Sequence, residues 1–211
     1  MTMKFWQKEY KKKNFFWGLK PWKGLKKVLK YTFAGKALDL GAGEGRNSIF
    51  LAKNGFEVLA IDKIPEGLAK IAELGCPKIT TKTIDMRKFR FPSKRFSLII
   101  STFTIDFLKK SEIETLIKKI KKSLLPNGIV YFCVFSVKDP AYCKKKQIEK
   151  NTIYLPKLKL YQHFFTKDEL RKMFEDFNII YLRENRFKDI PNNKPHLVHF
   201  HNIIEFIAKG R

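Results

Sequence analysis

The chain has 211 residues, which is enough for one domain with a full hydrophobic core. It carries 44 Lys and Arg against 20 Asp and Glu, a formal net charge of +24, and three Cys. Without a run of 18 apolar residues, no membrane-spanning helix is expected, and three cysteines do not form a disulfide framework. The apolar residues of the basic N-terminus alternate with Lys, unlike the core of a signal peptide, so we expect a reduced, cytoplasmic protein.

The positive charge does not identify a partner. A balance this basic is typical of proteins that bind nucleic acids or anionic surfaces. The excess is mostly lysine, with 36 Lys against 8 Arg, and is spread along the whole sequence. Nucleic-acid readers favour Arg for its bidentate contacts, so solvated lysine faces explain this composition more simply.

Residues 1–35 are basic and rich in aromatic residues. The spacing of Leu25, Val28 and Leu29 predicts a short amphipathic helix ahead of the first strand. We predict that residues 1–35 form an N-terminal helical cap that covers the sheet, and that some of its aromatic residues close over a ligand. Residues 36–211 then form the main domain.

From residue 36 onward, strand and helix patterns alternate. The predicted strands are 36–40, 56–62, 78–85, 96–102, 129–135, 177–185 and 199–208, and the predicted helices are 46–53, 65–74, 112–124 and 166–174. A capping box of Ser111 and Glu114 is expected to open the third helix. Repeated βα units predict a doubly wound α/β fold, a seven-stranded and mostly parallel sheet, and the short last connection makes the C-terminal strand antiparallel.

A glycine-rich turn follows the first strand and leads into a helix. Gly41, Gly43 and Gly45 allow the backbone to bend tightly and to approach a ligand. The dinucleotide pattern G-x-G-x-x-G is broken by Arg46, and no Gly-Lys-Ser/Thr of a P-loop follows. Asp39, two residues before the first glycine, would repel a pyrophosphate and attract an ammonium group.

Two further carboxylates are expected at the same edge of the sheet. Asp62 ends the second strand and is placed to bind both hydroxyls of a ribose, and Asp85 ends the third strand and is suited to accept from an adenine amino group. Together with the glycine turn, they predict a cofactor with a cationic amino-acid end and an adenosine end.

These residues resemble the class I S-adenosylmethionine-dependent methyltransferases, which have a Rossmann-like fold. The stretch 45–58, with Ile61-Asp62-Lys63 after it, is similar to the tellurite-resistance (TehB-like) methyltransferases, as are Ser101-Thr102-Phe103 and the stretch 164–170. The resemblance covers roughly residues 36–208. It implies methyl transfer from S-adenosyl-L-methionine to a small acceptor, such as a chalcogen oxyanion or a thiol.

The resemblance also implies roles for individual residues. The turn would hold the methionine end of the cofactor, near Arg46 and Asn47. The ribose would bind at the end of the second predicted strand and the adenine at the end of the third. The residues after the fourth predicted strand would line the side of the cofactor that donates the methyl group. The cofactor-binding residues expected on this basis are Asp39, Gly41, Ala42, Gly43, Gly45, Arg46, Asn47, Asp62, Lys63, Asp85, Met86, Ser101, Thr102 and Phe103. The segment 136–162 is not one that we match to the family from these motifs, and we expect the acceptor to be selected there or nearby.

Histidines are the candidates for a general base, which is needed only if the acceptor carries a proton. The chain has His163, His196, His199 and His201. We predict that His196 is catalytic and that Arg46 assists an anionic acceptor. The last three histidines also suit a metal, but no Cys or carboxylate lies at ligand spacing, so no metal site is predicted.

Two other functions stay open. The charge favours an RNA or protein methyltransferase, although no Asn/Asp-Pro-Pro-Tyr/Phe follows strand 96–102 and no RNA-binding module is appended. A non-catalytic, cofactor-binding subunit is the other alternative. The expected partner is a small-molecule substrate. Nucleic acid stays open but is not favoured, no membrane partner is expected, and the protein is expected to be a monomer or a dimer.

Overall fold

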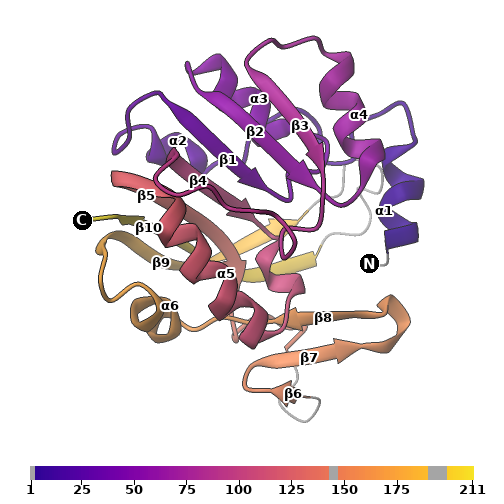
Figure 1. Ribbon diagram of the computed structural model, residues 1–211. Coiled ribbons are helices and arrows are strands. Elements are labelled where there is room, and N and C mark those ends of the chain that lie inside the picture. The colour runs from indigo at the N-terminus through magenta and orange to yellow at the C-terminus, as the bar shows by residue number, and fades with distance from the viewer. Residues whose placement is uncertain (1–2, 143–146, 190–198) are drawn as a thin grey trace.

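The computed structural model describes residues 3–142, 147–189 and 199–211, which form a central sheet covered by helices on both faces (Figure 1). The seven strands of this sheet lie in the order β3-β2-β1-β4-β5-β10-β9. Their bounds are β1 (Lys36–Leu40), β2 (Glu57–Asp62), β3 (Ile79–Thr83), β4 (Phe96–Thr102), β5 (Leu124–Phe135), β9 (Asn178–Asp189) and β10 (His199–Lys209). Strands β1 to β5 are parallel, and β10 is antiparallel to both of its neighbours. The predicted doubly wound, mostly parallel sheet is confirmed.

Two apolar layers hold the helices against the sheet. Helices α2 (Leu25–Val28), α3 (Arg46–Lys53) and α4 (Pro65–Glu73) cover one face, and α5 (Lys110–Ser123) and α6 (Lys167–Met173) cover the other. Strand β4 serves both layers, because Leu98 and Ile100 face α2 and α3 whereas Ile99 faces α5. This alternation explains why the central parallel strands are almost continuously apolar.

The boundaries around α5 differ from the prediction. The helix begins after Lys109, whose backbone N–H donates to Glu112 at 2.9 Å, so the capping box predicted at Ser111 and Glu114 is wrong. The helix ends at Ser123, because Leu124 is already extended and pairs with Phe96 in the sheet. Strand β5 therefore starts five residues before the predicted position, with a register shift beside Leu98.

Residues 147–163 form a second, smaller sheet. Strands β6 (Gln147–Glu149), β7 (Thr152–Leu155) and β8 (Leu160–His163), with the 3₁₀-helix η3 (Pro156–Leu158), lie apart from the main sheet (Figure 1). Strand β8 contacts the 3₁₀-helix η1 (Ile105–Phe107), which follows β4. The buried His163 fixes this sheet, because its ring nitrogens contact the Thr152 hydroxyl at 2.8 Å and the Glu169 carboxylate of α6 at 3.1 Å.

The N-terminal segment lies over the glycine turn. Helix α1 (Met3–Tyr10) packs beside α4 (Figure 1). The Phe16 N–H donates to Glu44 at 2.6 Å, the Trp22 N–H donates to Asn47 at 2.9 Å, and the Trp22 indole N–H donates to Glu205 of β10 at 3.1 Å. The division into a cap of residues 1–35 and a domain of residues 36–211 stays a prediction. Within the described ranges, no helix is long and apolar enough to cross a membrane.

The packing of α2 against the sheet can be tested at Gly24, which directly precedes the helix. A Cβ at Gly24 would lie 1.8 Å from Oε1 of the buried Glu205 and 2.3 Å from the Tyr131 hydroxyl. We expect Gly24→Ala to lower the free energy of unfolding by about 1–3 kcal/mol, measured by urea denaturation. Lys26→Ala, an exposed change on the same helix, is the matched control, and equal stability of the two variants would contradict this packing.

Candidate active site

The glycine turn has a shape that only glycines accept without strain. Gly41, Gly43 and Gly45 have φ of +75°, +56° and +83°. The N–H groups of Gly41 and Ala42 both donate to the Ile61 carbonyl of β2, at 2.8 and 3.0 Å. A Cβ at Gly45 would lie 2.4 Å from the Ile71 side chain of α4. The turn is therefore fixed to β2 and packed tightly against α4.

Asp39 lies beneath the turn. Its side chain is almost fully buried and accepts a hydrogen bond of 2.7 Å from the Ser48 hydroxyl of α3. Burial raises the pKa of Asp39 to about 7. A cation bound at the turn would stabilise the ionised carboxylate.

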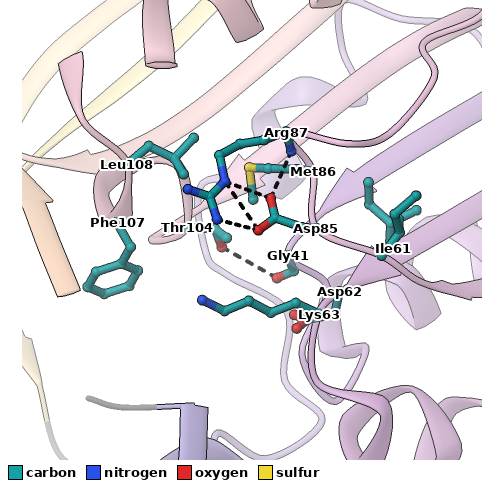
Figure 2. Close-up of a pocket in the computed structure, with 11 residues that line it drawn as sticks. Gly41, Ile61, Asp62, Lys63, Asp85, Met86, Arg87, Thr104, Phe107 and Leu108 are labelled. Atoms are coloured by element: carbon teal, nitrogen blue, oxygen red, sulfur yellow. Dashed lines mark hydrogen bonds and ion pairs between the residues drawn. The ribbon is translucent and has the colours of Figure 1, made fainter. Parts of the chain in front are cut away.

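A cavity opens beside the turn, at the carboxyl ends of β1 and β2 and the loop after β3 (Figure 2). Asp62 lies in its wall, and its carboxylate oxygens accept 2.9 Å hydrogen bonds from the N–H groups of Gly43 and Ile64. The cavity is lined by Gly41, Ile61, Asp62, Lys63, Ile84, Asp85, Met86, Arg87, Thr104, Phe107 and Leu108. Each carboxylate oxygen has two acceptor positions, so Asp62 keeps capacity for hydroxyl donors.

A charged chain of side chains borders the cavity. Arg87 binds Asp85 through Nε at 2.9 Å and Nη2 at 2.5 Å, and its Nη1 binds Glu112 of α5 at 2.8 Å (Figure 2 shows the Asp85 pair). These hydrogen bonds hold the pKa of Asp85 below its usual value. Asp85 is thus a carboxylate at neutral pH, and Arg87 fixes its orientation.

The start of α3 connects the turn to β4 and to the N-terminal segment. The Asn47 amide accepts from the Trp22 N–H and donates to the Thr102 hydroxyl, both at 2.9 Å. The Arg46 guanidinium carbon lies 5.6 Å from the centre of the Trp17 ring and 5.9 Å from that of Trp22. Burial lowers the pKa of Arg46, although the neighbouring phenol and carboxylates oppose this shift.

The predicted residues fall into two groups. Gly41, Asp62, Lys63, Asp85 and Met86 line the cavity. The others, Asp39, Ala42, Gly43, Gly45, Arg46, Asn47, Ser101, Thr102 and Phe103, lie in the turn, at the start of α3 and at the end of β4. Ser101 is fully buried, with its hydroxyl 3.5 Å from the Leu40 carbonyl.

Several lining residues escaped the sequence prediction. Thr104 directly follows the predicted stretch 101–103, and its hydroxyl lies 3.4 Å from the Gly41 carbonyl (Figure 2). Arg87 comes two residues after Asp85, and only the folded chain brings it to Glu112. The sequence signal that could have indicated Thr104 and Arg87 is that each is a polar residue close to a predicted strand end.

The histidines are placed differently from one another. His196 lies outside the described residues, and the side chain of His199 is not described. The Nδ1 of His201 contacts the buried Asp139 at 2.8 Å, and Asp139 also accepts from the Asn202 N–H at 2.9 Å. Within the described ranges, no three His, Cys, Asp or Glu residues gather as a metal site requires.

A buried carboxylate that the sequence did not reveal lies next to Asp139. Asp106 of η1 accepts a 2.7 Å hydrogen bond from the Phe135 N–H, and its second oxygen has no partner among the described residues. Burial raises the pKa of Asp106 to about 8. Asp106 is therefore largely protonated at neutral pH.

A sheet of this order, with a glycine turn after β1 and carboxylates at the ends of β2 and β3, defines the class I S-adenosylmethionine-dependent methyltransferase fold. The chain belongs to the TehB family, since the family model described as "Tellurite resistance protein TehB" matches residues 7–189.

Individual relatives are distant. A probable S-adenosyl-L-methionine-dependent methyltransferase TehB of Haemophilus influenzae is 25% identical over 153 residues, covering 71% of this chain and 48% of the relative. Hemagglutinin 1 of Eikenella corrodens is 24% identical over 151 residues, covering 71% and 46%. The chain thus spans about half the length of these curated relatives.

Solved structures share the fold. The crystal structure of TehB from H. influenzae matches with a TM-score of 0.72 at 20% identity. The match covers 99% of this chain and 67% of the chain in that structure. A Burkholderia thailandensis 1,6-didemethyltoxoflavin-N1-methyltransferase, crystallised with 1,6-didemethyltoxoflavin and S-adenosylhomocysteine, has a TM-score of 0.65 at 19% identity, covering 88% and 74%.

The buried carboxylates predict a pH dependence of stability. Asp39 and Asp106 have pKa values of about 7 and about 8 in the folded chain, above their usual value of 3.8. Between the usual and the raised pKa of each group, the folded state therefore binds more protons than the unfolded state. The free energy of unfolding of the ligand-free protein is therefore expected to fall as the pH rises from 4 to 8. Urea denaturation across this range should show a shallower fall for Asp39→Asn, and an unchanged slope would contradict the burial of an ionisable Asp39.

Proposed function

We propose that the chain is an S-adenosyl-L-methionine-dependent methyltransferase that acts on a small-molecule acceptor. The observation that carries this proposal is the cavity that brings the glycine turn together with Asp62 and Asp85. When bound, S-adenosyl-L-methionine supplies an electrophilic methyl group on a sulfonium sulfur. The membership in the TehB family and the shared fold support the same activity.

The lining of the cavity fits an adenosine. Asp62 already accepts two backbone N–H groups, and its remaining lone pairs would accept from the ribose hydroxyls. Asp85, kept ionised by Arg87, would accept from the adenine amino group. The apolar side chains of Ile61, Ile84, Met86 and Leu108 would enclose the base.

The turn fits the charged methionine end. Asp39, with Ala42, Gly43 and Gly45 above it, would attract the ammonium group, and Lys63 would lie along the ribose edge. Arg46 and Asn47, at the first turn of α3, would face the carboxylate, where helix N–H groups also favour an anion. Thr102 holds Asn47 in place, and Ser101 and Phe103 complete the end of β4.

The protein's task in the reaction is alignment and proton control. Arg46 would orient an anionic acceptor. We keep His196 as the proposed base for an acceptor that carries a proton. An acceptor that arrives as an anion needs no base.

A small acceptor is preferred over RNA because only the overall charge favours a polyanion. The B. thailandensis structure, which shares the fold, holds a small heterocycle. We further infer a cytoplasmic monomer or dimer without a membrane partner, and we do not favour nucleic acid as its partner.

Loss of cofactor binding in Asp62→Asn tests the cavity. The neutral amide loses charge-assisted acceptance from the ribose, so we expect the affinity for S-adenosyl-L-methionine to fall about tenfold or more by titration calorimetry. Glu57→Gln, an exposed carboxylate on the same strand, is the control and should bind as the native chain does. Absence of binding by the native chain would overturn the proposed activity.

A methyl-transfer screen tests the class of acceptor. Radiolabelled S-adenosyl-L-methionine is expected to label a pool of small thiols, oxyanions and aromatic acids, and to leave an RNA pool unlabelled. Labelling of RNA alone, together with RNA retention that weakens steeply with salt, would replace the small acceptor by nucleic acid.

A further inference from the structure

Aromatic side chains gather at the ends of β4, β5 and β9. The aromatic cluster consists of Trp22, Phe103, Phe135 and Phe187, whose neighbouring ring centres are 4.8–6.4 Å apart. Trp22 is buried, but the three phenylalanines keep part of their surface exposed. Exposed ring surface beside a site is a surface on which a ligand ring can stack.

Phe103 has a backbone that suggests a task beyond filling the core. Its φ is +52°, in the left-handed region, where a bulky residue is strained. Its N–H donates to the Cys133 carbonyl at 2.9 Å, which fixes this conformation. It also stands between Thr102, which binds Asn47, and Thr104, which lines the cavity.

Cations border the cluster. The Arg46 guanidinium lies over the rings of Trp17 and Trp22, and within residues 3–142, 147–189 and 199–211 it makes no hydrogen bond or ion pair. The Lys23 ammonium lies 5.7 Å from the centre of the Phe187 ring. A planar guanidinium with its donors unused is a strong binding group for a carboxylate or another planar anion.

The sheet order separates this cluster from the cavity. The cavity lies mainly over the ends of β1 and β2 and the loop after β3, on one side of the glycine turn, and Thr104, Phe107 and Leu108 form its wall on the β4 side. The cluster lies over β4, β5 and β9, on the other side. If the cavity holds adenosine, the cluster lies where an acceptor must approach the methyl group.

We infer that the methyl acceptor is a small aromatic anion, whose ring stacks on the aromatic cluster and whose negative charge meets Arg46. This inference rests on the proposed function. A chalcogen oxyanion fits less well, because it would exchange a full hydration shell for rings that offer no hydrogen bonds. An uncharged ring would leave unused those Arg46 N–H donors that the cofactor carboxylate does not take.

Binding to the enzyme saturated with S-adenosylhomocysteine tests the inference. The probes are 2-naphthoate, 2-naphthamide, octanoate and selenite, which separate the contributions of ring and charge. We expect titration calorimetry to give 2-naphthoate a dissociation constant about tenfold lower than that of each other probe. Equal or tighter binding of selenite or octanoate, or no binding of 2-naphthoate, would overturn the inference.

Substitution within the cluster tests whether the ring binds there. Phe187→Leu and Phe135→Leu remove aromatic faces and keep apolar volume, and Phe33→Leu, with Phe33 57% exposed, is the matched control. We expect the dissociation constant of 2-naphthoate to rise about fivefold or more in the first two variants, with S-adenosylhomocysteine affinity within about twofold of the native chain. Unchanged naphthoate binding in both variants would contradict the assignment.

The two proposals fail separately. If the native chain binds neither S-adenosyl-L-methionine nor S-adenosylhomocysteine, the proposed function falls and the inference falls with it. If either of these binds but 2-naphthoate does not bind more tightly than the other probes, only the inference of an aromatic anionic acceptor is rejected.

Discussion

The interlock between the glycine turn and β2 is the constraint on which the site depends. One carbonyl, that of Ile61, receives two N–H groups from the turn, and the next residue, Asp62, receives a third from Gly43. The loop that follows β1 is thereby fixed to the neighbouring strand. Because the same backbone bonds orient the Asp62 carboxylate, the turn and the first acidic side chain of the cavity form one rigid unit. Everything else in the site is built around this unit.

Much of the framework could be predicted because its signals are local. Strands β1 and β4 and helix α3 have the predicted bounds, since strand-long apolar runs and the glycine turn mark their ends in the sequence. The small sheet of β6 to β8 could not be found in this way. Its strands have three or four residues, too few for a periodic pattern, and its anchor is a contact of His163 with Glu169 of another element.

The prediction of the site shows the same division. Gly41, Asp62 and Asp85 were found because the glycine pattern and the predicted strand ends indicate them in the sequence. All three line the cavity. Arg87 and Asp106 were missed because their roles depend on contacts between distant parts of the chain. Arg87 binds Glu112, and Asp106 is buried and accepts from the Phe135 N–H, and neither contact can be read from the spacing of residues in the sequence. The composition of the chain does not show which of its many cations lie near the site. In the folded chain, the cations near the site are individual groups such as Arg46 and Lys23, held by aromatic rings.

The contacts of the N-terminal segment bear on how the family can diversify. Glu44 and Asn47 hold this segment by its main-chain N–H groups at Phe16 and Trp22. A main-chain donor is supplied by every residue except proline, so these two hydrogen bonds do not depend on which side chains stand at positions 16 and 22. Exchange of the aromatic side chains in this segment would therefore leave the hydrogen bonds to Glu44 and Asn47 in place.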